Sequence, residues 1–217
     1  MLDLGFIARN MPVLLEGLWL TAQLSTIAAL FAAVLGFPIA IARMSRHRVL
    51  RMAVGAYIEF FRNTPLLHQL FLVFFGLPFI GIVIPNLIAA GFALSLLHAA
   101  FFAEIYRSAI ESVDRGQHQA GRALGMQETT VLRLVILPQA LVNAIPLIVS
   151  QLVLVFKDSS LGATIGIMEL TLSGRTLAER TAASYEVFIV VGALYLAVTT
   201  VLGLLAKYLE VRFRVAR

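Results

Sequence analysis

The run Lys157 to Ser160 (KDSS) combines side chains that could bind a small zwitterionic solute, and it directly follows a long apolar segment. Such a solute needs acceptors for its ammonium group and donors for its carboxylate, and an aspartate, a lysine and two hydroxyls provide both. Gln151 lies about two helical turns earlier and would add an amide. The alternative is that Lys157 and Asp158 mark the outer end of a membrane-spanning helix, and the residues alone leave both interpretations open.

A second polar group precedes Pro65 in the segment RNTP. Proline removes a backbone donor and disfavours the helical conformation of the residue before it, so a helix that reaches Thr64 should break there. A broken helix in a membrane is tolerated only where it is buried or lines a cavity. Asn63 and Thr64 are therefore candidates for a solute pathway, with a simple packed kink as the alternative.

Two acid–base pairs in apolar surroundings are spaced three residues apart, and each therefore shares one helical face: Glu59 with Arg62, and Glu104 with Arg107. A charge at the middle of a bilayer costs about 2.5–3.5 kcal/mol on insertion scales, so each charge needs a partner. We expect Glu59 and Arg62 to form a structural ion pair. Glu104 and Arg107 are either a gate on a pathway or an interfacial ion pair.

Metal binding and nucleotide chemistry have little support in this chain. It contains no cysteine, and His68 and His98 lack partners at metal-ligand spacing, so we expect both to be packed or to line a pore. The glycines lack the Gly-Lys-Ser/Thr ending of a phosphate-binding loop. We expect no metal, no cofactor and no enzymatic activity in this chain.

The stretch DRGQHQAGRALGM (114–126) is polar within a chain that is 60% hydrophobic. Residues 117–129 are predicted to form a short helix in which Gly121 and Gly125 share a face. Glycine inside a helix costs about 1 kcal/mol relative to alanine, so two of them indicate that another backbone approaches closely. The alternative is a solvated loop with a helical turn.

The composition places the chain in a membrane. Only 13% of its residues are charged, against about 25% in soluble domains, and its mean hydropathy is +0.91. The net charge of +5 does not indicate nucleic acid, because the basic residues lie between apolar runs, where they set the orientation of a membrane protein. Lipid is the expected surrounding.

About 20 apolar residues are needed to cross a bilayer as a helix. Five segments are predicted to do so: 14–41, 54–84, 87–107, 134–160 and 187–207. The chain is thus expected to be one all-α transmembrane domain (1–217), with a cytoplasmic connection at 108–133. The segment 169–185 is either an interfacial helix or a solvated loop.

Basic residues set the orientation. Twelve of them fall on one side of this topology: Arg43, Arg46, Arg48 and Arg51; Arg107, Arg115, Arg122 and Arg133; and Lys207, Arg212, Arg214 and Arg217. The connections on the other side hold only Arg9, Arg175 and Arg180. Since the basic side faces the cytoplasm, the N-terminus should be external and the C-terminus cytoplasmic.

The segment QHQAGRALGMQETTVLRLVILPQA resembles the EAA loop of importer permeases of the ATP-binding cassette (ABC) superfamily. Gln119, Ala120 and Gly121 match its opening triplet, Gly125 its glycine, and VILP (135–138) its ending. Gln119 replaces the family's glutamate and Gly121 its second alanine. The lost carboxylate puts in doubt any salt bridge that this glutamate makes with its partner.

Three further segments are similar to the polar amino acid permease branch of that superfamily: FFRNTPLLHQLFLVFFGLP, FFAEIYRSAIESVDRGQ and FKDSSL. The resemblance, which runs from about residue 15 to 211, implies a type I permease fold with a cytoplasmic coupling helix. The candidate pathway residues are Asn63, Thr64, Glu104, Arg107, Gln151, Lys157, Asp158, Ser159 and Ser160, and the resemblance favours the pathway interpretation for the KDSS run. It implies contact with an ATPase subunit at Arg115, Gly116, Gln117, His118, Gln119, Ala120, Gly121, Ala123, Leu124, Gly125 and Met126, with Ala120 and Gly125 in a cleft of that subunit.

The partners implied are a cytosolic ATPase that binds ATP and Mg, a second permease subunit, identical or paralogous, and an external amino-acid-binding protein. The resemblance further implies a bacterial inner membrane and import by alternating access, with glutamate, aspartate, glutamine, histidine or arginine as substrate. Two rival classes remain. An ion-coupled secondary transporter would titrate Glu59 or Asp158, and a membrane enzyme would need a nucleophile–base pair that the chain does not provide convincingly.

Overall fold

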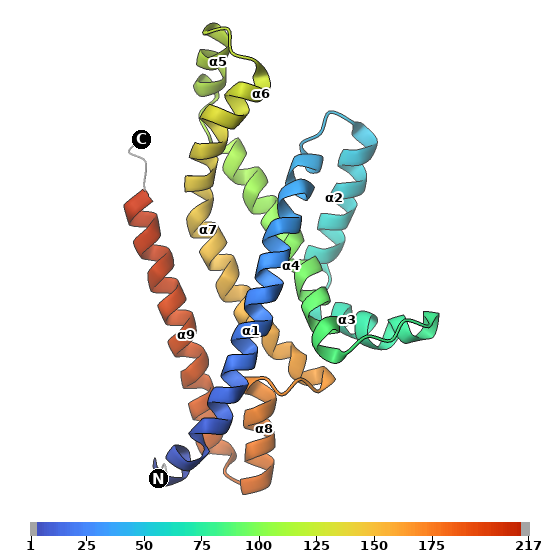
Figure 1. Cartoon of the computed structure of the whole chain (residues 1–217), viewed down its shortest axis with the longest axis vertical. Helices are drawn as coiled ribbons and strands as arrows, with labels where there is room; N and C mark the ends of the chain where they lie inside the picture. The colour runs from blue at the N-terminus through green and yellow to red at the C-terminus, as the bar shows by residue number, and fades with distance from the viewer. Residues whose placement is uncertain (1–3, 214–217) are drawn as a thin grey trace.

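The computed structural model of the chain describes residues 4–213, which are almost entirely helical and contain no strand. Long helices run along the longest axis of the molecule, with short helices at both ends and one arm at the side (Figure 1). The predicted all-α class is confirmed.

The most extensive helix pair within this range joins α1 (Leu4–Arg43) to α4 (Asn86–Glu111). Small residues allow the two helices to approach closely. A Cβ atom on Gly36 would lie 2.6 Å from the Cβ of Phe102 and 3.1 Å from the backbone nitrogen of Ala103. Close contact between small residues is how helices associate in lipid, where burying an apolar side chain gains little. This pair is the scaffold against which the other helices pack.

Helix α2 (Arg48–Asn63) ends at the break that Pro65 predicts, and Thr64 is extended with φ −106° and ψ 132°. The side-chain amide of Gln69 donates hydrogen bonds to the carbonyls of Phe61 and Thr64, both at 2.9 Å. These bonds satisfy acceptors that the interrupted helix would otherwise leave without partners. Hydrogen bonds from Gln69 therefore stabilise the break at Pro65.

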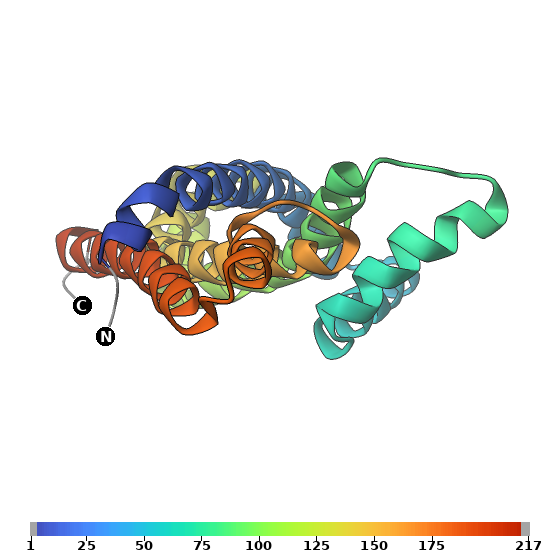
Figure 2. The same ribbon diagram turned by 90° about the horizontal axis from the view of Figure 1, so that it is seen from below.

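The chain continues beyond this break as α3 (Leu66–Phe71), a π-helical turn (Leu72–Gly76) and a 3₁₀ turn (Leu77–Ile80). The segments Arg48–Asn63 and Leu66–Ile80 differ in direction by 105°. Figure 2 shows this arm extending away from the bundle. The break expected at Pro65 is confirmed, and a membrane span over 54–84 stays a prediction for this bent pair of segments.

The polar connection forms a helical hairpin of α5 (Arg115–Ala123) and α6 (Glu128–Val131), followed by a π-helical turn (Leu132–Ile136) and α7 (Leu137–Asp158). The predicted continuous helix over 117–129 is wrong. Gly125 has φ +76° and ends α5, since the amide of Gly125 bonds to the carbonyl of Arg122 and that of Met126 to the carbonyl of Gly121. This pairing is the Schellman arrangement that closes many helices.

A 3₁₀ segment (Ser159–Ile165) follows α7 and leads to α8 (Leu170–Thr181) and then α9 (Ser184–Phe213). The segment 169–185 was expected to be either an interfacial helix or a solvated loop, and its residues 170–181 are helical. Four helices of the described range are long and apolar enough to cross a membrane: α1, α4, Glu128–Ile165 and α9. The bent pair would make a fifth.

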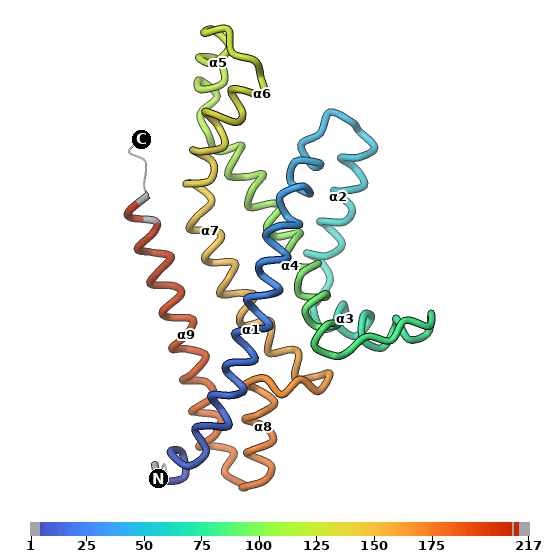
Figure 3. The backbone as a smooth tube through the Cα atoms, viewed as in Figure 1, coloured from blue at the N-terminus to red at the C-terminus, as the bar shows by residue number. Residues whose placement is uncertain are grey.

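The α5–α6 hairpin and the end of α9 lie at one end of the molecule, while α8 and the start of α1 lie at the other (Figure 3). The turn between α1 and α2 lies toward the hairpin end (Figure 1). The three connections that carry most basic residues therefore share one end. Arg214 and Arg217 lie outside the described residues.

Candidate functional site

Asp158, at the end of α7, is linked to α4 through a buried histidine. Nε2 of His98 lies 3.3 Å from Oδ2 of Asp158, and Nδ1 of His98 lies 2.6 Å from Nε2 of Gln151. The His98 side chain is 1% exposed and that of Asp158 is 38% exposed. Asp158 thus lies close to a buried histidine and is itself partly exposed. The two predicted residues Gln151 and Asp158 both lie next to His98, which was expected to be packed or to line a pore.

The other residues of the KDSS run differ in their accessibility. Lys157 is exposed and Ser160 is half-buried, whereas Ser159 is fully buried and donates its hydroxyl hydrogen to the carbonyl of Phe156 at 2.8 Å. Because α7 ends here, the negative end of its helix dipole lies beside Asp158. Asp158, Lys157 and Ser160 therefore leave polar atoms available for a solute, and Ser159 mainly stabilises the turn.

A second cluster joins α2 to α4. The guanidinium of Arg62 lies 3.8 Å from the Glu104 carboxylate and 5.2 Å from the ring centroid of Phe101. Glu104 also pairs with Arg107 at 2.8 Å, and Arg107 pairs with Glu111 at 2.6 Å. The predicted Glu104–Arg107 pair is present. The predicted Glu59–Arg62 pair is not formed, because Arg62 turns toward α4 instead.

The two clusters lie next to each other on α4. His98 and Glu104 are six residues apart, which corresponds to about 9 Å along the helix axis. Phe101 lies between them, with its ring 6.2 Å from that of His98 and beneath the guanidinium of Arg62. Of the residues predicted near the proline break, Asn63 is exposed and Thr64 donates its hydroxyl hydrogen to the carbonyl of Phe60 at 2.6 Å.

The α5–α6 hairpin presents a largely exposed surface. Asp114 caps α5 by accepting a hydrogen bond from the amide of Gly116, at 2.6 Å. Gly121 is buried, and a Cβ there would lie 2.6 Å from Cγ2 of Val131, so the close approach to Gly121 comes from the chain itself. The exposed residues of the predicted contact set are Arg115, Gly116, Gln117, Gln119, Ala120, Ala123, Leu124 and Gly125, with His118 and Met126 half-buried. Leu124, at 81% exposed, is an apolar side chain available to a partner.

One contact ties this hairpin to the connection between α1 and α2. Arg46 and Glu128 form an ion pair at 3.1 Å, with both side chains mostly exposed. An exposed pair of this kind contributes about 0–1 kcal/mol, so it aligns the two segments more than it stabilises them. The sequence gives no signal for it, since the two residues are 82 positions apart.

A buried carboxyl group, Glu169, joins three helices near the opposite end. Its oxygens accept hydrogen bonds from the amide of Leu172 at 2.8 Å, the hydroxyl of Tyr195 at 2.8 Å and the hydroxyl of Thr21 at 3.4 Å. Burial raises the pKa of Glu169 above its ordinary value, and these hydrogen bonds limit the rise. Its position before α8 is a signal for a helix cap, but only the fold shows its partners on α1 and α9.

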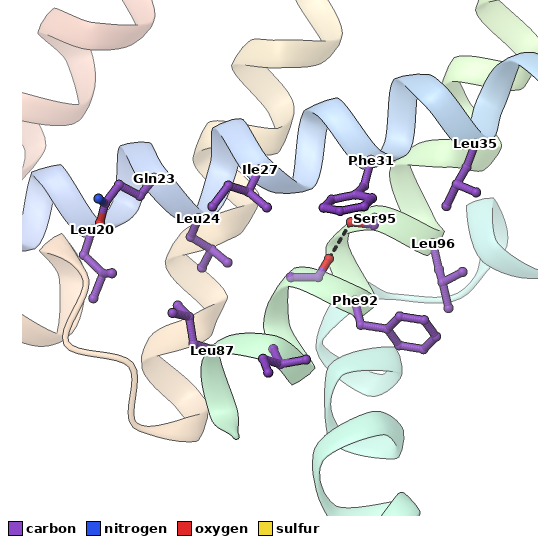
Figure 4. Close-up of a pocket in the computed structure, with 12 residues that line it drawn as sticks. Leu20, Gln23, Leu24, Ile27, Phe31, Leu35, Leu87, Phe92, Ser95 and Leu96 are labelled. Atoms are coloured by element: carbon purple, nitrogen blue, oxygen red, sulfur yellow. Dashed lines mark hydrogen bonds between the residues drawn. The ribbon is translucent and has the colours of Figure 1, made fainter. Parts of the chain in front are cut away.

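An apolar groove of about 590 Å³ lies between α1 and α4 (Figure 4). Its lining residues are Leu20, Gln23, Leu24, Ile27, Phe31, Leu35, Leu87, Ile88, Gly91, Phe92, Ser95 and Leu96. Ser95 donates its hydroxyl hydrogen to the carbonyl of Gly91 at 2.6 Å, so the wall has little free polarity. This lining suits hydrocarbon and does not suit a zwitterion. Within residues 4–213, no three His, Asp or Glu side chains are close enough together to hold a metal ion.

Known proteins match this chain over nearly its whole length. The chain is 34% identical over 219 residues to the L-cystine transport system permease protein TcyL of Bacillus subtilis (strain 168), covering 98% of this chain and 92% of that protein. It is 32% identical to the arginine transport system permease protein ArtQ of the same organism, over 96% of both chains.

Solved structures share the fold. A chain of an amino acid ABC transporter crystallised with histidines superposes with a TM-score of 0.94 at 32% identity, covering 98% of this chain and 99% of that one. A chain of the inward-facing MetNI methionine ABC transporter gives a TM-score of 0.81 at 22% identity over 94% of this chain and 98% of that one, which supports the fold alone. The family model for the binding-protein-dependent transport system inner membrane component matches residues 12–215, and the chain therefore belongs to this family of membrane permease subunits.

Proposed function

We propose that the chain is the permease subunit of an ABC importer that moves a polar amino acid into the cell. The main supporting observation is an accessible carboxylate, Asp158, which lies 3.3 Å from the buried His98 at the end of a membrane helix. Relatives over almost the full length carry names that refer to amino acid transport, which supports the same substrate class. The chain supplies the pathway, and a separate subunit supplies the energy.

Asp158 accepts hydrogen bonds from the ammonium group of the substrate in this proposal, while Lys157 and Ser160 donate to its carboxylate. The end of α7 favours the ammonium group, because the C-terminal end of a helix carries partial negative charge. Gln151 contacts His98, which lies next to Asp158. Asn63 and Thr64 at the break, and the Glu104–Arg107 pair on α4, line the next part of the pathway. Ser159 shapes the turn that presents these groups.

The substrate side chain is open within this proposal. The relatives' names include L-cystine, arginine and glutamine, which share only the α-ammonium and α-carboxylate groups. Recognition of these shared groups by Lys157 and Asp158 fits glutamate, aspartate, glutamine, histidine or arginine equally. The external binding protein would then make the choice among side chains.

The α5–α6 hairpin is the proposed contact for a cytosolic ATPase subunit that binds ATP and Mg. Its exposed face, with Ala120 and Leu124, would enter a cleft of that subunit, and the paired Arg46 and Glu128 would pass movement on to the α1–α2 connection. Two permease subunits, identical or paralogous, would approach at their hairpins when ATP binds and so open the pathway outward. The proposal places the chain in a bacterial inner membrane with the hairpin and C-terminus cytoplasmic.

Uptake by the reconstituted importer tests this proposal. The permease, its ATPase and its binding protein are placed in liposomes, and uptake of a panel of amino acids is measured with and without ATP. Asp158→Asn should raise KM by tenfold or more, on the order of one charge-assisted hydrogen bond. Glu179→Gln is the matched control, since Glu179 is exposed on α8 and paired only with Arg175. Uptake that depends on an ion gradient and is the same with and without ATP would contradict the proposal.

A further inference from the structure

His98 is a buried, titratable side chain that the transport proposal does not itself require. Among the buried polar side chains that the structure describes, only those of His98 and Glu169 are titratable. His98 lies inside α4, in a helix long and apolar enough to cross a membrane. A polar ring at this depth is costly unless its nitrogens have partners, so those partners indicate what the ring is for.

The contacts of His98 define how its ring is oriented. Nε2 of Gln151 lies 2.6 Å from Nδ1, and an amide nitrogen that donates there leaves the ring hydrogen on Nε2. The acceptor nearest to that nitrogen is Oδ2 of Asp158, at 3.3 Å. Nε2 forms no hydrogen bond in this structure, and Asp158 is close enough to accept one after a small movement of its side chain. The ring also packs against Phe101, and Arg62 lies on that aromatic side chain, so neither neighbour competes for Nε2.

We propose that His98 is a positioning residue for substrate recognition, acting through Asp158. Its Nε2 hydrogen would bond to Oδ2 once Asp158 moves closer, and this would turn Oδ1 toward the exposed side, where an ammonium group would bind. Gln151 fixes the ring and so sets the direction of that hydrogen bond. The inference rests on the proposed function, because it assigns to Asp158 the ammonium group of the substrate. It adds His98, a residue of α4, to the candidate residues Gln151, Lys157 and Asp158 of α7.

This role has a kinetic consequence that a packing role lacks. Loss of the Nε2 donor leaves Asp158 free to rotate, so the substrate binds less tightly while the moving parts of the transporter are unchanged. KM should rise by on the order of tenfold, and the maximal uptake rate should stay within about twofold. A hole left by a packing residue would instead lower the amount of folded protein or the maximal rate.

The experiment compares four variants of the reconstituted importer. His98→Leu removes both nitrogens, His98→Gln keeps a donor near the position of Nε2, and His98→Asn keeps only the position facing Gln151. His68→Leu is the matched control, because the His68 side chain is exposed on α3 and forms no hydrogen bond with the described residues. KM should rise for His98→Leu and His98→Asn, return toward the wild-type value for His98→Gln, and stay unchanged for His68→Leu.

A double-mutant cycle with Asp158→Asn completes the test. If His98 acts through Asp158, His98→Leu adds little to the KM of the Asp158→Asn protein. A strong effect of Asp158→Asn with none of His98→Leu would overturn the role of His98 and leave the proposed function standing. Wild-type uptake that neither substitution alters would overturn both. A His98→Leu protein that loses maximal rate at unchanged KM would show that the ring only packs.

Discussion

Gly125 adopts a backbone conformation that side chains with a Cβ atom reach only at a cost. Its φ of +76° lies in the left-handed region, and two backbone hydrogen bonds close α5 around it. A Cβ atom at this position would meet no atom of the chain within 4 Å. Inside the molecule, the glycine is therefore required by the turn and not by lack of space.

Two substitutions at Gly125 separate the turn from close docking of a partner. Asparagine tolerates the left-handed region better than alanine, which costs about 1 kcal/mol there. We expect ATP-driven uptake and amide protection of α5 against hydrogen exchange to fall in the order glycine, asparagine, alanine. The order glycine, alanine, asparagine would mean that size decides, as expected if the ATPase approaches this backbone closely.

At the scale of a single helix, Glu169 shows how one carboxyl group can stabilise a whole element. It caps α8, which lies outside the candidate spans, and its other partners come from α1 and α9. Its pKa is raised by burial, so the folded protein binds a proton more tightly than the unfolded chain does. Stability from this group is fully present below the unfolded pKa of about 4.3 and is lost as pH rises through the folded pKa.

Glu169→Gln should remove this dependence. The amide cannot ionise, so the melting temperature of the detergent-solubilised variant should decline less than that of the wild type as pH rises from about 4.3 toward neutrality. Glu179→Gln on the same helix is the control, because its carboxylate is exposed and paired only with Arg175. Parallel pH profiles for the wild type and Glu169→Gln would show that the carboxyl group titrates equally in both states.

The elements differ in how well the sequence predicts them. Apolar length alone is enough for α1 and α9, and Pro65 predicts where α2 ends. The 105° bend could not be predicted, because it depends on how the arm packs. The prediction of one helix over 117–129 was wrong because Gly125 was interpreted as a packing residue inside a helix, whereas it ends a helix.

The residues of the candidate site also differ in how well the sequence predicts their contacts. Lys157, Asp158 and Gln151 could be found from the sequence because they lie close together on one helix. His98 could not be linked to them, since the pairing with Gln151 spans 53 residues and depends on how α4 packs against α7. A histidine within an apolar helix was the only available signal. Arg62 was assigned to its neighbour Glu59 for the same reason, and the fold gives it Glu104.

At the scale of the whole molecule, the basic connections and the polar hairpin occupy one end and α8 the other (Figure 1). The distribution of basic residues and the arrangement of the helices thus both distinguish one end of the molecule from the other. A permease that couples an internal motor to an external delivery protein needs such a polarity, because the two partners bind opposite ends. The proposed orientation, with the hairpin inside, follows from the excess of lysine and arginine at that end.

The absence of cysteine from the chain makes this orientation directly measurable. Ala120→Cys on the exposed face of α5 and Arg180→Cys at the end of α8 each introduce one thiol at an accessible position. A membrane-impermeant maleimide applied to spheroplasts should label Arg180→Cys at once, and Ala120→Cys only after the membrane is permeabilised. Inside-out vesicles should give the reverse order. Labelling of position 120 in intact spheroplasts would place the hairpin outside, where no cytosolic ATPase could reach it, and the proposed coupling would be lost with it.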